Sequence, residues 1–172
     1  YKCTDCSNSE THGVQTVSIE NLEWQKSTAS ENDGVSLNES IQWNQNKVNW
    51  DNANIYCSNL NLGGKQDWRL PNINELKTLL ICEYPHECNG LNPPYILDEF
   101  KSTTLFMAEY PYDAYWSSQA ASATHAFAVR YGNEASEWGG VKSHNHLIRC
   151  VRDKNNDSEE SSDNNTYQEI FR

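Results

Sequence analysis

Six cysteines are the residues of this chain whose type and spacing indicate chemistry most directly. They are an even number among 172 residues, a usage typical of disulfide bonds made in an oxidising compartment. Cys82 and Cys88 enclose a turn that contains a proline, which can bring their Cα atoms within bridging distance. If Cys3 and Cys6 also pair locally, Cys57 is left to pair with Cys150. The candidate disulfide residues are therefore Cys3, Cys6, Cys57, Cys82, Cys88 and Cys150.

The pair Cys3 and Cys6 has other interpretations. A Cys-x-x-Cys string can be half of a zinc site or a redox pair. No second Cys-x-x-Cys follows in the sequence, and no Trp-Cys-Gly-Pro context surrounds this one, which favours a local disulfide. The cysteine usage as a whole predicts an extracellular or cell-surface protein, with a signal peptide removed before Tyr1.

Metal-ligating residue types are present but poorly arranged for a metal site. His144 and His146 would lie on one face of an extended segment, which is a spacing that metal sites use. No third ligand is close in the sequence, so we expect no metal and no other cofactor. Calcium is the alternative, because several pairs of carboxylates could donate oxygens, although none has the order of an EF-hand loop. These carboxylates are Glu83, Glu87, Asp98, Glu99, Glu109 and Asp113.

The sequence contains no motif that would indicate catalysis. Gly-x-Ser-x-Gly, His-Glu-x-x-His and a phosphate-binding glycine loop are all absent, so we expect no enzyme. Twenty-four Asp and Glu residues against 13 Lys and Arg residues give a net charge of -11. This charge repels nucleic acids, anionic lipids and sulfated polysaccharides. No apolar run approaches the 18 or so residues that cross a membrane, so membrane insertion is not expected.

The first half of the chain predicts one strand pair and two helices. Apolar and polar residues alternate from 14 to 20 and again from 22 to 25, which favours two paired strands. Asn49 can cap a helix whose apolar side chains recur between Trp50 and Leu60. Asn72 and Glu75 have the spacing of a capping box for a second helix, which we expect to continue through Leu80.

The second half predicts a small antiparallel sheet. Segments 115–118, 126–131 and 146–152 have strand composition, and Gly-Asn and Gly-Gly pairs separate them. Two helices packed on one small, twisted sheet define a loop-rich, disulfide-bonded α+β domain. We expect an arm at 1–13, a domain at 14–153 and an acidic tail at 154–172. The tail is polar until an apolar cluster that could dock on a neighbouring copy, namely Tyr167, Ile170 and Phe171.

Three strings together resemble the Lcl C-terminal domain family, named after a collagen-like bacterial adhesin. They are Asn-Leu-Glu-Trp-Gln at 21–25, Asp-Trp-Arg-Leu-Pro-Asn-Ile-Asn-Glu-Leu at 67–76, and Tyr-Trp-Ser-Ser at 115–118 followed by Arg-Cys-Val-Arg at 149–152. In order and spacing they cover residues 14–153. The resemblance implies a C-type-lectin-like scaffold on secreted or surface-anchored bacterial proteins, related in shape to formylglycine-generating enzymes. It implies no reaction.

Physical reasoning gives the shared residues structural roles. Arg69 should point away from Trp68 and Leu70 and brace the start of the second helix through carboxylates or carbonyls. Trp24, Trp68 and Trp116 are large enough that core packing explains them better than stacking on a ligand.

We therefore expect a recognition or adhesion module that binds a glycan or a protein at the cell surface. Trp138 could stack on a sugar ring, or it could fold down over the sheet edge. The candidate ligand-binding residues are Trp138, Glu134, Glu137 and Tyr131. The alternative is a structural subunit of an extracellular filament or other homo-oligomer, in which the arm or the tail docks on the next copy.

Overall fold

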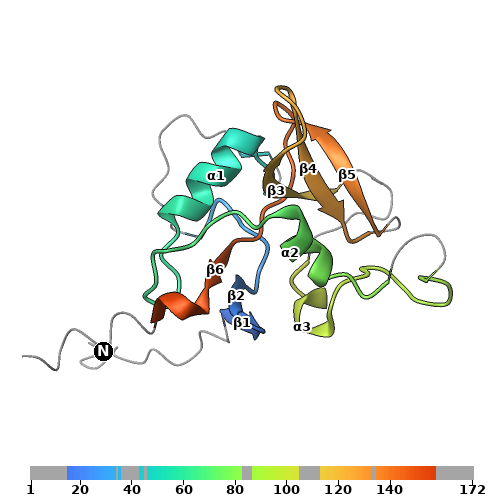
Figure 1. Cartoon of the computed structure of the whole chain (residues 1–172), viewed down its shortest axis with the longest axis horizontal. Helices are drawn as coiled ribbons and strands as arrows, with labels where there is room; N and C mark the ends of the chain where they lie inside the picture. The colour runs from blue at the N-terminus through green and yellow to red at the C-terminus, as the bar shows by residue number, and fades with distance from the viewer. Residues whose placement is uncertain are drawn as a thin grey trace, which may run out of the picture.

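The computed structural model of this chain describes residues 15–33, 35, 43–44, 46–82, 87–104, 113–132 and 135–157. These residues form an α+β structure with two small antiparallel sheets and a few short helices. In Figure 1, helix α1 and the sheet of β3, β4 and β5 lie in the upper part of the molecule. The sheet of β1, β2 and β6 lies in the lower part, and α2 lies between the two sheets. The elements in chain order are β1 Thr16–Ile19, β2 Leu22–Gln25, α1 Trp50–Asn59, α2 Ile73–Thr78, α3 Asp98–Lys101, β3 Ala114–Ala120, β4 His125–Arg130, β5 Ser136–Val141, β6 Val151–Asp153 and the 3-10 turn η1 Lys154–Asp157.

The first sheet joins the two ends of the described chain. Strands β1 and β2 form the hairpin that the alternating pattern predicts, with Thr16 opposite Gln25 and Ile19 opposite Leu22. Strand β6 then pairs with β2, and Val151 lies opposite Trp24. The first and last strands of the domain thus share one sheet.

Both helices begin at the residues that the sequence indicates. The side chain of Asn49 accepts a hydrogen bond from the amide of Asn52 and caps α1. Asn72 and Glu75 form a complete capping box at the start of α2. Helix α2 is shorter than expected, because it ends at Thr78 and Leu79 serves as its C-terminal cap.

The second sheet differs from the prediction in its third strand. Its order is β3-β4-β5, and β5 contains the Gly139-Gly140 pair that was expected to form a turn. The indole rings of Trp116 and Trp138 lie against Gly140, which requires a residue without a side chain at this position of the strand. A Cβ atom there would lie 2.7 Å from each ring.

Residues 146–152 do not form the third strand that the sequence indicated. They run out of the second sheet and into the first. His146 bridges to Val48, and Leu147 makes a parallel bridge to Tyr115. Val151 then begins β6 in the other sheet. The single sheet that we expected is therefore two sheets linked by this segment.

The β3-β4-β5 sheet is covered on both faces. One face, which includes Trp116, packs on α1 through Ala53 and Tyr56. The other face, which includes Tyr115, packs on α2 through Leu76. Burial of these apolar side chains on both faces of the sheet stabilises the domain.

Two disulfides close the described structure, as predicted. Cys57 on α1 bonds to Cys150 across 93 positions of sequence. Cys82 bonds to Cys88 and closes the local turn. Cys3 and Cys6 lie outside the described residues, as do the rest of the arm at 1–13 and the tail beyond residue 157.

Candidate functional site

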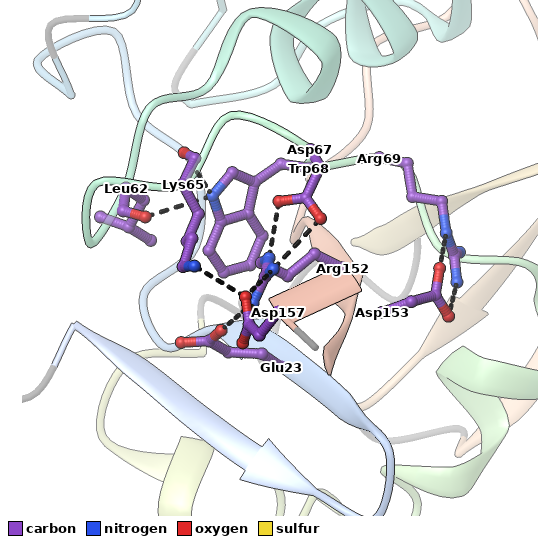
Figure 2. A network of polar contacts seen from close by, with 9 residues as sticks. All are labelled: Glu23, Leu62, Lys65, Asp67, Trp68, Arg69, Arg152, Asp153 and Asp157. Carbon is purple, nitrogen blue, oxygen red and sulfur yellow. Dashed lines mark hydrogen bonds and ion pairs between the residues drawn. The ribbon is translucent and has the colours of Figure 1, made fainter. Parts of the chain in front are cut away.

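Arg152 lies at the centre of a polar network between the two ends of the chain (Figure 2). Its side chain is 1% exposed and donates hydrogen bonds to three carboxylates. The guanidinium group is 2.7 Å from Glu23 on β2, 2.7 Å from Asp67 and 2.7 Å from Asp157 on η1. These bonds raise the pKa of Arg152 and lower that of Asp157, with the hydrogen bond between them as the largest cause in each case. The network therefore ties together strand, connector and 3-10 turn.

Arg69 braces the start of α2, as the sequence predicted. Its Nη1 and Nη2 atoms each donate to an oxygen of Glu75 at 2.8 Å. The same guanidinium group also bonds to Asp153 at 3.2 Å. The side chain of Glu75 in turn accepts from the backbone amide of Asn72. The hydrogen bond to Glu75 is the main cause of the raised pKa of Arg69.

Trp68 and Arg149 make further hydrogen bonds between these segments. We refer to the bonds of Arg152, Arg69, Trp68 and Arg149 together as the framework. The indole Nε1 of Trp68 donates to the carbonyl oxygens of Leu62 and Lys65, which fixes the loop before the motif (Figure 2). Arg149 is fully buried, and it donates to the carbonyl oxygens of Gln25 and Lys26. Its guanidinium carbon lies 4.7 Å from the ring centroid of Phe100, and burial lowers its pKa. A buried cation is tolerated here because carbonyl dipoles and aromatic faces surround it.

An open pocket of about 550 Å³ lies beside this framework. Three segments that are distant in the sequence form it: the outer face of α1, the extended connector before α2, and β3. Most of its side chains are neutral amides, hydroxyls or apolar groups, and Arg69 is the one cation of the lining among the described residues. The lining comprises Asn54, Ile55, Ser58, Trp68, Arg69, Leu70, Asn72 and Ser118.

Backbone bonds hold the connector side of this pocket in place. The amide of Ser118 donates to the carbonyl oxygen of Pro71 at 2.8 Å. Arg69 and Val151 exchange two backbone hydrogen bonds, at 2.8 and 2.9 Å. The connector is thus fixed to β3 on one side and to β6 on the other, so backbone hydrogen bonds of the protein itself hold this wall of the pocket.

A comparison with protein families gives a match to the family described as the Lcl C-terminal domain, over residues 15–152. The match covers most of the chain and confirms the resemblance seen in the motifs. The chain belongs to the Lcl C-terminal domain family. A comparison with curated proteins finds no match.

In this member of the Lcl C-terminal domain family, the shared strings are structural. Arg152 donates hydrogen bonds to Asp67, and Arg69 donates to Glu75. The side chains of Trp24, Trp68 and Trp116 are buried. The family name suggests a surface adhesin-type module. The two disulfides of the described structure are consistent with an extracellular location.

The structure gives Trp138 a packing role at the sheet edge. The guanidinium carbon of Arg130 lies 4.7 Å from the centroid of its ring, and His146 meets it edge-on at 5.0 Å between centroids. The indole also packs over Gly140. Trp138 is half-buried against the core on α1, which matches the interpretation of a tryptophan folded down over the sheet.

The other candidate ligand-binding residues do not gather around Trp138. Tyr131 is 1% exposed, and its hydroxyl donates to the carbonyl oxygen of Leu76. Its prediction as a surface ligand contact is wrong, because the sheet turns this ring into the core beside α2. Glu137 is exposed and pairs with Lys77 on α2 at 3.3 Å. Glu134 lies outside the described residues.

The candidate metal residues are likewise dispersed. His146 is buried between Trp116 and Trp138, whereas His144 lies in the exposed turn after β5. Asp98 pairs with Lys101, and Asp113 pairs with Lys47. Within the described ranges, no group of three or more His, Cys, Asp or Glu side chains is placed to hold a metal ion.

Other sequence predictions fall outside the part that can be described. Glu83 and Glu109 are among these residues, and so are Tyr167, Ile170 and Phe171. Across the described part of the chain, no helix has the length and apolar character needed to cross a membrane.

The sequence does not predict the pocket. Ile55 and Ser58 on α1 belong to no motif. Ser118 belongs to the Tyr-Trp-Ser-Ser string, but only its backbone bond to Pro71 reveals that it lies beside the connector. No local sequence signal brings these segments together.

Proposed function

We propose that this chain is a non-catalytic recognition module of an extracellular bacterial surface protein, and that its ligand is a glycan or a protein. The observation that carries the proposal is that structural contacts and an open pocket lie side by side at the Asp-Trp-Arg-Leu-Pro string. Its charged side chains bond to the rest of the framework, while an open pocket lined mainly by neutral groups lies beside it. Neutral amides and hydroxyls suit binding, whereas general acid-base catalysis needs titratable groups directed at a substrate.

We further propose that the fold is related to the C-type-lectin-like scaffold. Two small antiparallel sheets, the joining of first and last strands, and a long-range disulfide from α1 to the segment before β6 support this relation. In such an arrangement, short elements and disulfides stabilise the domain while the connecting segments supply binding surfaces.

The test of recognition is the binding of the intact, non-reduced chain to printed glycan and protein arrays and to whole cells. The proposal predicts saturable binding to at least one class of ligand, which reduced and unfolded chain does not reproduce. A chain that binds nothing on either array or on cells would contradict the recognition role.

The role of structural subunit stays a prediction. It depends on the arm at 1–13 and on Tyr167, Ile170 and Phe171, which lie outside the described residues. Light scattering on the whole chain and on a chain ending at Asp157 would decide it, since η1 and its contacts to Arg152 are kept in the shorter chain. Loss of an oligomer on truncation would support a building block, and two monomers would remove this alternative.

A further inference from the structure

We propose that the pocket between α1, the connector at 67–72 and β3 binds one uncharged pyranose residue of a glycan. The proposal rests on the recognition role above and specifies its site and ligand class. The lining combines apolar groups with neutral hydrogen-bonding side chains. A pyranose ring presents the same combination, with C–H groups on its faces and hydroxyls around its edge.

The polar groups of the pocket are only partly engaged by the protein. Asn54 donates through Nδ2 to the carbonyl oxygen of Trp50, which leaves its Oδ1 as an acceptor. The hydroxyl of Ser58 donates to the carbonyl oxygen of Ile55 and keeps its lone pairs. These two side chains stand one turn apart on α1, so they present acceptors to the same face.

The opposite side of the pocket offers donors. Asn72 accepts through Oδ1 from the amide of Glu75, and its NH₂ group has no partner among the described residues. Arg69 uses four N–H groups on Glu75 and Asp153, which leaves one N–H of its Nη1. A hydroxyl group both donates and accepts, so acceptors on one side and donors on the other suit a ligand rich in hydroxyls.

The charge around the pocket selects against anions. Arg69 is already bonded to the carboxylates of Glu75 and Asp153. A sulfate or a uronic acid would therefore have to displace these carboxylates, or bind next to them against their repulsion. The net charge of -11 adds long-range repulsion. A neutral sugar avoids both costs, and Ile55 and Leu70 provide apolar contact for its ring.

The test is NMR titration of the whole ¹⁵N-labelled chain with uncharged gluco-, galacto- and manno-configured trisaccharides and, separately, with a heparin-derived tetrasaccharide. Binding of one residue in an open pocket is expected with a Kd on the order of 1 mM. At least one neutral trisaccharide should shift the amide signals of Asn54, Ser58 and Asn72.

Three variants localise the site. Ser58→Trp fills the pocket from an exposed helical position and should weaken binding about tenfold or more. Ser18→Trp makes the same change on the exposed face of β1, away from the pocket lining, and should leave binding unchanged. Asn72→Asp keeps the helix cap but removes the NH₂ donor, so it should weaken binding about fivefold.

Three results would overturn the proposal. These are shifts confined to another surface, equal affinity of Ser58→Trp and the unaltered chain, and preferential binding of the heparin tetrasaccharide. A chain that recognises a protein or a sulfated glycan elsewhere would keep its recognition role and lose this site. A chain that binds nothing in the titrations and nothing on arrays or cells would lose both.

Discussion

At the scale of single residues, Arg152 is the point on which the framework depends. It is almost completely buried and satisfies carboxylates from β2, the connector and η1 at once. Arg152→Ala leaves these carboxylates without their cation, so we expect the free energy of unfolding to fall by about 2 to 4 kcal/mol. Urea unfolding of the non-reduced chain measures the change.

The matched control for Arg152 is a surface pair. Lys101 bonds to Asp98, whose side chain is 88% exposed, and Lys101→Ala should change the free energy of unfolding by less than about 0.5 kcal/mol. Equal, small effects of the two substitutions would show that the network of Arg152 contributes no more than an ordinary surface ion pair.

Gly140 offers a test of packing with its own neighbour as control. An added Cβ would lie 2.7 Å from the rings of Trp116 and Trp138, whereas at Gly139 it would meet nothing within 4 Å. Gly140→Ala should therefore destabilise the domain by about 1 to 3 kcal/mol, and Gly139→Ala should be close to neutral. Thermal unfolding of both variants distinguishes them, and a neutral Gly140→Ala would mean that the rings can move apart.

At the scale of elements, the sequence predicts the helix caps, which are local, but not the long-range pairing of strands. The caps at Asn49 and Asn72 are made by residues within three positions of the helix start, so the sequence predicts them. The third strand of the second sheet was misplaced because a glycine pair usually indicates a turn. Here Gly140 serves close packing under two indoles, which no local pattern reveals.

The two disulfides should differ in what they contribute. Cys57–Cys150 spans 93 positions and Cys82–Cys88 spans 6. In the chain-entropy description, the long bridge stabilises by about 4 to 5 kcal/mol and the short one by about 2 kcal/mol. Urea unfolding of the two double alanine variants measures the difference. A larger loss for Cys82→Ala with Cys88→Ala would contradict this ranking.

The docking of η1 on Arg152 should depend on pH. Hydrogen bonds from Arg152, and then from Lys65, hold the pKa of Asp157 below its ordinary value of 3.8. Because the folded pKa is lowered, the stabilisation of docking is fully present above pH 3.8, and it declines as the pH falls from there toward the lower folded pKa. The amide signals of Lys154 and Asp157 in NMR spectra between pH 6 and 2 report this change.

Asp157→Asn provides the control for that titration. The variant lacks the carboxylate, so the signals of η1 should change little across the same pH range, and Asp98→Asn should behave like the unaltered chain. Identical profiles for all three proteins would show that another group governs the acid response of η1.

At the scale of the whole molecule, the family and the role of its motifs follow from the sequence, but the pocket does not. The bracing role of Arg69 could be predicted, because an extended backbone points its side chain away from Trp68 and Leu70, where the guanidinium group can reach carboxylates or carbonyls. The pocket requires α1, the connector and β3 to meet, and these lie up to 64 positions apart, from Asn54 to Ser118. An aromatic residue near a turn is a candidate ligand contact, yet Trp138 packs at the sheet edge.

The central claim is that this domain recognises its ligand at the pocket beside the framework. The most direct measurement is NMR titration of the unaltered chain, Ser58→Trp and Ser18→Trp with one set of neutral and sulfated oligosaccharides. The account predicts that the unaltered chain and Ser18→Trp bind the same neutral glycans and that Ser58→Trp loses them. Equal binding by all three proteins, or binding confined to sulfated glycans, would contradict it.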